Sequence, residues 1–167
     1  MLKTFKTALF AALFAVVSFS AQAEETTGNS FNFTVQGTIP AYCEVTPRSN
    51  LSATETIDLE DTGDQFLGQL TYTCNLPEGF TRTISSANGG TLNSGNTAIP
   101  YELSSGGGSG GSSLGFGFTS LSTDIVDSHG PFPEGQNGAL NVRVPSLPGN
   151  ALAGVASDVI TVSIAGN

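Results

Sequence analysis

Few residues in this chain of 167 could act as nucleophiles or bases. The run GGSGG at 107–111 satisfies the Gly-x-Ser-x-Gly pattern of hydrolases, and His129 is the single histidine. That pattern exposes its serine only where a strand turns sharply into a helix, and no helix pattern follows the run. We expect His129, in the segment DSHGPFPEG, to be a solvated loop residue. The sequence therefore predicts no catalytic residues, and we expect the protein not to be an enzyme.

Metal and cofactor ligands are equally sparse. The acidic stretch that begins at Asp58 resembles the opening of a calcium-binding loop, but its twelfth position is Gln69 rather than a bidentate glutamate. Cys43 and Cys74 would supply only half of a tetrahedral zinc site, and His129 gives no obvious complement. No nucleotide-binding loop is present. We therefore expect neither a metal nor a cofactor.

The first 23 residues, MLKTFKTALFAALFAVVSFSAQA, have the layout of a cleaved secretory signal. Two lysines precede an apolar run at about 8–19, which is too short for a membrane span, and small residues up to Ala23 suit a cleavage site. We expect residues 1–23 to be removed and the rest to be exported with no membrane span. In an exported chain, two cysteines favour one disulfide, Cys43 to Cys74, over a metal site or a nucleophile.

The charge of the chain argues against one class of partner. Once residues 1–23 are removed, no lysine remains, and three arginines face fourteen acidic residues. Polyphosphate and anionic membrane surfaces repel such a chain, so we expect no nucleic-acid binding. The acidity favours solubility and resistance to random association over a dedicated acidic binding patch.

The rest of the sequence predicts an all-β domain, because short apolar runs alternate with turn residues and no helical period appears. Turns are expected at 88–90, 93–96 and 148–150. Strands are expected at 31–45 with a break near Pro40, 54–59, 67–74, 81–86, 99–104, 114–121, 139–144 and 158–164. The Gly/Ser-rich tract at 104–118 could link two domains, but too few strands flank it to close two cores. We therefore expect one sandwich or barrel with a long internal loop.

The segment SFNFTVQGTIPAYC at 30–43 alternates apolar and polar residues. Its apolar positions share one face of an extended chain; they are Phe31, Phe33, Val35 and Ile39, with Gly37 in phase. The segment lies beside the cleavage site, where a chain is usually ordered only if something holds it. Alternation predicts a strand with one apolar face. It leaves open whether this strand completes the chain's own sheet or a neighbour's.

Three features together resemble the pilin subunits of bacterial chaperone–usher fimbriae. They are the alternating segment after an export signal, the cysteine that closes it, and a second cysteine at the end of LTYTC. The closing half, NVRVPSLPGNALAGVASDVITVSI, is most similar to the spore coat protein U family and its archaic pilin relatives. Classical pilins often end with an aromatic residue near the last position, whereas this chain ends in IAGN.

The resemblance implies an immunoglobulin-like, pilin-type β-sandwich at 38–167 that lacks its last strand, preceded by a donor-strand extension at 24–37. In this family a periplasmic chaperone first fills the groove, and the extension of a neighbouring subunit then replaces it at an outer-membrane usher. The implied donor residues are Phe31, Phe33, Val35, Gly37 and Ile39. The implied function is that of a structural subunit of a fimbria, pilus or coat-like fibre, at the cell surface or outside it, that supports adhesion or biofilm formation.

A second hypothesis is a self-contained secreted β-sandwich that binds a ligand or surface. Its contact would be an exposed apolar loop tip formed by Leu114, Phe116 and Phe118, which follow the Gly/Ser-rich tract. Residues of this kind are more often part of a core strand, and burial in the folded chain distinguishes the two cases.

Overall fold

The computed structural model describes residues 31–48, 50–107, 114–151 and 153–167. Residues Thr38–Asn167 form one compact unit, and the described residues contain ten strands and no helix. The strands are β1 (Cys43–Pro47), β2 (Gln65–Cys74), β3 (Phe80–Ser86), β4 (Thr91–Ser94), β5 (Thr97–Pro100), β6 (Glu102–Gly107), β7 (Phe116–Ser120), β8 (Ile125–His129), β9 (Phe132–Arg143) and β10 (Ile160–Gly166).

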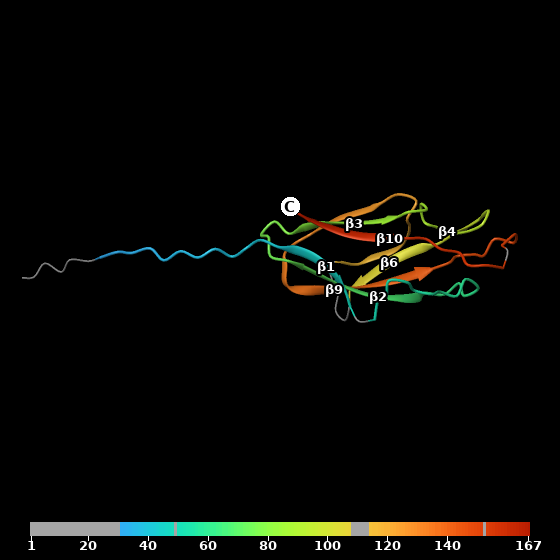
Figure 1. Ribbon diagram of the computed structural model, residues 1–167, viewed down its shortest axis with the longest axis horizontal. Coiled ribbons are helices and arrows are strands. Elements are labelled where there is room, and N and C mark those ends of the chain that lie inside the picture. Colours follow the sequence, from blue (N-terminus) through green and yellow to red (C-terminus); the bar gives the residue numbers. More distant parts are fainter. Residues whose placement is uncertain (1–30, 49, 108–113, 152) are drawn as a thin grey trace, which may run out of the picture. The chain divides into compact units, whose positions relative to one another are not determined.

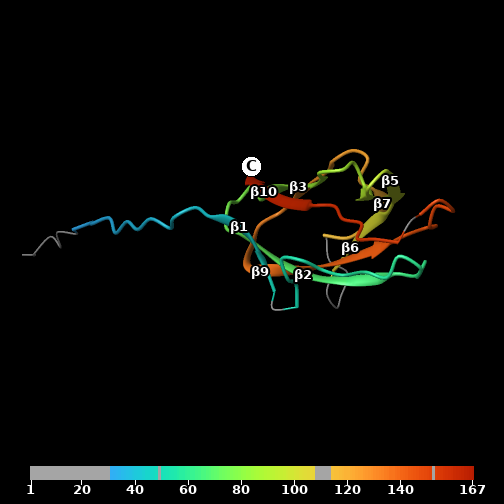
Figure 2. The ribbon, with the colours of Figure 1, turned by 45° about the vertical axis from the view of Figure 1, so that its right-hand side comes forward.

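The strands form two main sheets that face each other. One sheet has the order β1-β2-β9-β6-β7 and the other has the order β10-β3-β8, while β4 and β5 make a separate hairpin. All of these neighbours pair antiparallel. Figures 1 and 2 show β3 and β10 in one layer and β2 and β9 in the other. The prediction of an all-β sandwich is confirmed at this level.

The core lies between the two sheets. Successive side chains of a strand point to opposite faces, so each strand contributes every second residue to the interior, as in β2 and β3. The buried hydrophobic residues come from both layers: Leu70, Tyr72, Cys74, Phe80, Ile84, Ile99, Tyr101, Leu103, Leu114, Leu121, Leu140, Val142 and Val144.

Several predicted elements differ from the structure. Residues 54–59 form no strand, and of the range 31–45 only the part from Cys43 onward is in a strand. Strands β4 and β8 were not expected, because each is short and lies among turn residues. His129 is not a solvated loop residue; it ends β8 and is buried.

The turns and the Gly/Ser-rich tract follow the sequence more closely. Gly95 has a φ of 58° in the two-residue connection between β4 and β5, a conformation that favours glycine. The tract joins β6 to β7, which are antiparallel neighbours in one sheet. It is therefore a connection inside one domain, as expected, although residues 108–113 lie outside the described part. The predicted signal at 1–23 lies outside it too.

One buried polar cluster interrupts the apolar core. Arg82 of β3 is fully buried, and its guanidinium carbon lies 5.4 Å from the ring centroids of both Tyr72 and Phe116. It donates two hydrogen bonds to Asp127 of β8 and a third to the Leu114 carbonyl oxygen at 3.1 Å. Burying a charge without partners costs several kcal/mol, so these bonds are what make a cation tolerable here.

The ionisation of Asp127 depends on the same cluster. Burial alone would raise the pKa of its carboxyl, but the hydrogen bonds and charge of Arg82, with a smaller contribution from His129, outweigh burial and hold that pKa below its ordinary value. His129 Nε2 lies 3.1 Å from Asp127 Oδ1, and its ring centroid lies 5.3 Å from that of Phe80. The folded protein therefore favours the carboxylate form of Asp127.

The variant Asp127→Asn leaves Arg82 buried without a counter-charge. We expect it to lower the free energy of unfolding by about 3 to 5 kcal/mol, measured by urea denaturation. The matched control is Glu102→Gln, which breaks the half-exposed pair between Glu102 and Arg143 and should cost no more than about 1 kcal/mol. Equal losses in the two variants would contradict this account.

The pKa of Asp127 also predicts a dependence on pH. Because this pKa is lower in the folded than in the unfolded chain, the stabilisation is present above the unfolded value, close to 3.8, and is lost as the pH falls through the folded value. We expect the unfolding free energy of the wild type to fall more steeply in this acid range than that of Asp127→Asn. Parallel acid titrations of stability for the two proteins would refute this.

Candidate functional site

Among the described residues, the side chains that could perform chemistry are engaged in structural contacts, while the serine of the GGSGG run lies outside the described part. His129 faces the interior and approaches Asp127, whose carboxylate is held by Arg82. Both cysteines are joined in a disulfide, Cys43 to Cys74, as the sequence predicted. Within residues 31–48, 50–107, 114–151 and 153–167, no group of three His, Cys, Asp or Glu side chains could hold a metal ion.

The acidic loop that resembled a calcium site is held by local hydrogen bonds. The Asp58 carboxylate accepts from the Glu60 N–H at 2.9 Å, and the Asp61 carboxylate accepts from the Gly63 N–H at 2.8 Å. Aspartate commonly bonds to the backbone two residues on, which makes a turn. These bonds account for the aspartates as turn residues.

The most distinctive feature of the surface is an open seam between the two sheets, with β1 and β10 along it. Each of these is the outermost strand of its sheet. Their inward side chains are only half-buried, as Val45, Ile160 and Val162 show, whereas Phe80 and Ile84 on neighbouring β3 are fully buried. The interior is therefore incompletely covered along this line.

A groove of about 840 Å³ follows the seam. Its walls are mostly apolar and come from both layers, so it opens directly onto the core; they include Val45, Leu67, Leu70, Leu140, Ile160 and Val162. A groove of this kind, with apolar walls and unpaired strands beside it, is suited to an extended segment that supplies alternate side chains.

The backbone of β10 presents a regular free edge to this seam. The Val159 carbonyl accepts from the Ala87 N–H at 2.9 Å, and the Asn167 N–H donates to the Gly79 carbonyl at 3.1 Å. Along an antiparallel strand, successive residues direct their N–H and C=O groups alternately toward and away from the paired strand. Val159 and Asn167 bond to the residues that flank β3, so the even-numbered residues between them direct these groups away from β3. They are Ile160, Val162, Ile164 and Gly166.

The free edge of β1 is less complete. The Asn75 N–H donates to the Tyr42 carbonyl at 3.1 Å, and the Arg48 N–H donates to the Gln69 carbonyl at 3.0 Å. By the same alternation, Cys43, Val45 and Pro47 point their backbone groups away from β2. Pro47 has no N–H to offer, so β10 is the better template for an added strand.

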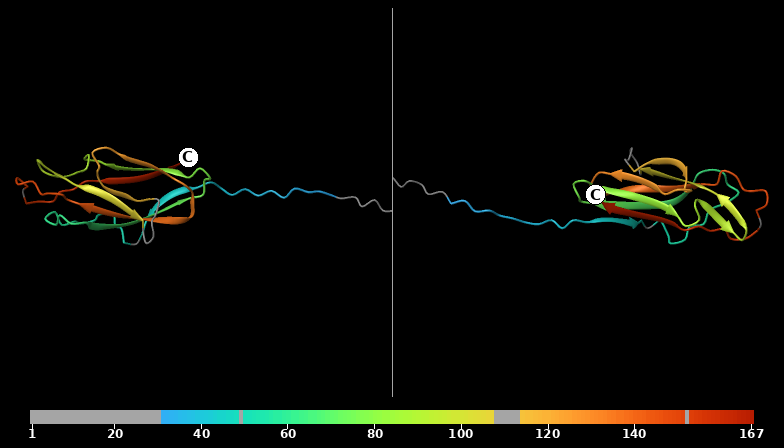
Figure 3. Two further views of the ribbon diagram at one scale, coloured as in Figure 1. Left: turned by 180° about the vertical axis from the view of Figure 1, so that it is seen from behind. Right: turned by 90° about the horizontal axis from the view of Figure 1, so that it is seen from above.

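The two ends of the seam differ. At one end, a Cβ atom placed on Gly166 would lie 2.2 Å from Leu76 Cδ1 and 3.5 Å from Cys43 Sγ, so β10 closes tightly against the start of β1. Figures 1 and 3 show the C-terminal end of β10 beside β1. At the other end the groove continues between residues 51–59 and residues 154–159. The groove is thus closed near Cys43 and open at the opposite pole of the domain.

Residues 54–59, which were expected to form a strand, line this open end. Ile57 and Leu59 pack against the core, while Asp58 between them is exposed. The Asp58 N–H donates to the Gln65 side chain at 2.7 Å, which attaches the segment to the start of β2. The alternation was therefore recognised correctly, but no neighbouring strand pairs with it.

The N-terminal segment, described from Phe31 onward, has the expected one-faced pattern. The ring centroids of Phe31 and Phe33 lie 6.4 Å apart, close to the roughly 6.6 Å that two residues of extended chain span. The apolar side chains are strongly exposed, by 86% for Phe31 and 85% for Ile39. Large apolar side chains exposed in such a regular series favour an interaction site. Donation of this segment to a neighbour stays a prediction.

The exposed apolar tip is not found. Leu114 is fully buried in the core, and Phe116 and Phe118 are half-buried on the same face of β7. Phe116 lies against Arg82, and the Phe118 ring lies 4.2 Å from the guanidinium carbon of Arg143. Pairing of β7 with β6 directs these side chains onto the sandwich, which removes the basis for a surface-binding tip.

Comparison with protein-family models, with curated proteins and with solved structures finds no match for this chain. In the part of the chain that the structure describes, no helix is long and apolar enough to cross a membrane.

The seam predicts that the folded protein binds an apolar fluorescent dye. Val162→Glu places a charge on the groove wall and should reduce dye fluorescence several-fold, because the charge disrupts the apolar surface. Ser163→Glu adds the same charge on the exposed face of the same strand and should leave dye binding unchanged. Undiminished binding by folded Val162→Glu would contradict the assignment of the groove.

Proposed function

We propose that this chain is a structural subunit of a fimbria, pilus or coat-like surface fibre that polymerises by donor-strand exchange. The observation that carries the proposal is the open seam, in which an apolar groove lies beside the free backbone edge of β10. The chain also has an exposed segment with one apolar face, at 31–39. In this proposal the domain is an immunoglobulin-like sandwich without its last strand, and the segment of a neighbouring copy supplies that strand.

The two elements match in length and in chemistry. The free edge of β10 spans seven residues and directs the backbone groups of every second one outward, and the segment 31–39 offers nine residues in extended spacing. An added strand gains main-chain hydrogen bonds along the edge and buries alternate side chains in the groove. Burying each of Phe31, Phe33 and Val35 contributes about 1.5 to 3 kcal/mol, enough in sum for a durable non-covalent contact.

The open end of the groove and the point where the N-terminal segment joins the domain lie at opposite poles, which favours a fibre that grows without closing. The groove is open at the pole opposite Cys43, while the chain joins the domain at the Cys43 pole. A donor that runs antiparallel to β10 keeps its own domain beyond the open pole, where there is room for it. Each copy thus donates at one pole and accepts at the other. Such a heterologous contact does not close on itself, so it generates filaments.

The proposed partners are other subunits of the same fibre, a periplasmic chaperone that covers the groove before assembly, and an outer-membrane usher. A chain with an open apolar seam is prone to aggregate unless the seam is covered. This supports the need for a chaperone. In this proposal the finished protein lies at the cell surface, in a fibre that serves adhesion or biofilm formation.

Deletion of residues 24–36 tests the donor role. We expect the shortened chain to lose polymers in analytical ultracentrifugation and to remain as a monomer or a chaperone-bound monomer, because its groove and fold are intact. Polymers of undiminished length from the shortened chain would refute the proposal. Failure to fold with or without the chaperone would show instead that the segment belongs to the chain's own sandwich.

A peptide of residues 27–39 tests the acceptor role directly. Added to the shortened chain at 100 times its Kd, it should raise the free energy of unfolding by about 2.7 kcal/mol and raise the melting temperature accordingly. A peptide with Phe33→Asp should bind far more weakly, while Asn32→Asp carries the same charge on the opposite face and should bind nearly as well. Equal binding by the two altered peptides would contradict an apolar groove contact.

A further inference from the structure

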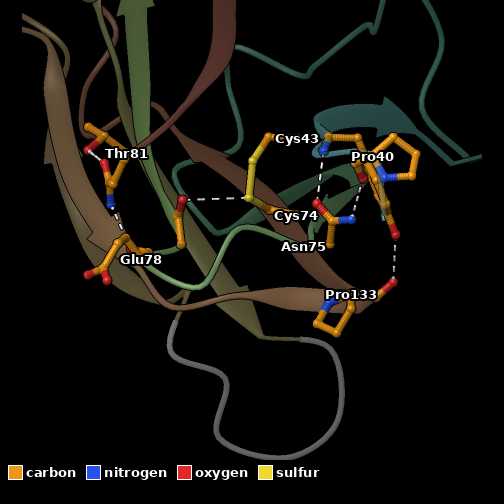
Figure 4. Close-up of a disulfide and its surroundings, with 10 residues drawn as sticks. Pro40, Cys43, Cys74, Asn75, Glu78, Thr81 and Pro133 are labelled. Atoms are coloured by element: carbon orange, nitrogen blue, oxygen red, sulfur yellow. Dashed lines mark hydrogen bonds between the residues drawn. A yellow bond between two sulfur atoms is a disulfide. The ribbon is translucent and has the colours of Figure 1, made fainter. Parts of the chain in front are cut away.

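We propose that Asn75 is a positioning residue that holds residues 40–42 in an extended path, so that the N-terminal segment is offered to a second copy of the chain and kept out of its own groove. This inference rests on the proposed function and deepens it. It names the residue that decides whether a groove receives the segment of its own chain (in cis) or that of a second copy (in trans). Figure 4 shows the residues involved.

The Asn75 side chain bonds to both sides of the same short stretch. Its Oδ1 accepts from the Tyr42 N–H at 2.8 Å, and its Nδ2 donates to the Pro40 carbonyl oxygen at 2.8 Å. The backbone N–H of Asn75 also donates to the Tyr42 carbonyl at 3.1 Å. Three bonds from one residue therefore continue the β1–β2 ladder beyond its last strand residue, toward the N-terminus.

Neighbouring contacts attach these three hydrogen bonds, here called the Asn75 clamp, to the domain. Cys74, the residue before Asn75, is bonded covalently to Cys43, the residue after Tyr42. The Tyr42 hydroxyl donates to the Pro133 carbonyl at 3.2 Å. With both anchoring points held to the sandwich, the three bonds of Asn75 act on residues that have little freedom to move.

The same loop holds the C-terminal end of the groove strand. Asn167 accepts from the Thr81 hydroxyl at 2.7 Å and donates through Nδ2 to the Glu78 carbonyl at 3.1 Å; Figure 4 shows Thr81 and Glu78 near the disulfide. Residues 75–79 thus connect residues 40–42 with the end of β10.

A cis complex would require these bonds to break. The chain enters β1 at the closed end. The whole segment 31–39, with Ile39 included, could therefore lie in its own groove only by reversing direction at residues 40–42. Pro40 restricts the preceding Ile39 to extended conformations, and Asn75 holds Pro40 and Tyr42 in line with β1. A reversal would sacrifice both side-chain bonds and turn the chain where proline resists turning.

The Asn75 clamp matters because the chain's own tethered segment would otherwise occupy the groove in preference to a neighbour's segment. A short flexible tether gives an effective concentration in the millimolar range, far above the concentration of a neighbouring subunit, and this advantage disappears only if geometry forbids the closure. Exchange between subunits therefore requires a device that forbids closure in cis. Asn75 opposes the turn at residues 40–42 that insertion of the whole segment 31–39 in cis requires.

The test uses the processed full chain with the variant Asn75→Ala. Hydrogen exchange should show at least about tenfold less protection of the Tyr42 amide, because its acceptor is gone. A monomer whose groove is filled by its own segment cannot take up a fluorescent 27–39 peptide. The ratio of this monomer to polymer should increase about ten- to thirtyfold, as expected from the loss of two hydrogen bonds of roughly 1 kcal/mol each. Ultracentrifugation measures the two populations.

Two further variants serve as controls. Asn75→Asp keeps the acceptor for Tyr42 and loses the donor to Pro40, so it should fall between wild type and Asn75→Ala. Asn141→Ala makes the same chemical change on β9, away from the exit, and should behave as wild type. Peptide uptake equal to that of the shortened wild type, when Asn75→Ala is placed in the chain that lacks residues 24–36, would exclude damage to the groove as the cause.

The outcomes separate this inference from the proposed function. If wild type forms polymers and Asn75→Ala does so to the same extent, the clamp is overturned while strand exchange stands. An unchanged Tyr42 amide in Asn75→Ala overturns the clamp as well. If wild type forms no polymers and the shortened chain takes up no peptide, the proposed function fails, and this inference fails with it.

Discussion

The central constraint in this protein is that two edge strands of the sandwich, β1 and β10, lie along one seam with no strand of the described residues between them. Their inward side chains remain half-buried, and the backbone of β10 directs alternate N–H and C=O groups into the gap. Apolar surface and unpaired strand edges are each unfavourable in water, and together they favour the addition of one more strand. The groove, the exposed N-terminal segment and the proposed exchange all follow from this gap.

The rest of the fold keeps the gap in place. On the side of the core away from the seam, the buried pair of Arg82 and Asp127 joins β3 to β8, beneath aromatic rings from the opposite sheet. At the closed end, the disulfide joins Cys43 to Cys74, and residues 75–79 bond to residues 40–42 and to Asn167. These contacts fix the start of β1 and the end of β10 to the same loop. In the proposed exchange, the groove beside them receives a segment without unfolding of the domain.

The sequence allowed much of the architecture to be predicted, since strand alternation and turn residues depend on local chemistry. β2, β3 and β10 were expected close to where they lie, only the second half of β9 was expected, and the disulfide followed from two cysteines in an exported chain. Residues 54–59 show the limit of that reasoning, because they alternate like a strand and yet no neighbouring strand accepts them. Asn75 gave no signal at all, since an asparagine after a strand is ordinary and its partners lie more than thirty residues away.

By itself, the sequence determined that the chain is built of one-faced strands, that its cysteines can pair, and that the segment at 31–39 has one apolar side. These properties depend on residue type and on the two-residue period of an extended chain. Only the tertiary structure decided that β1 and β10 are edges, that His129 and Leu114 are buried, and that the groove closes beside Cys43 and opens at the other pole. The physical reason is that an edge is defined by the absence of a neighbour, and long-range pairing between strands determines which strands have one.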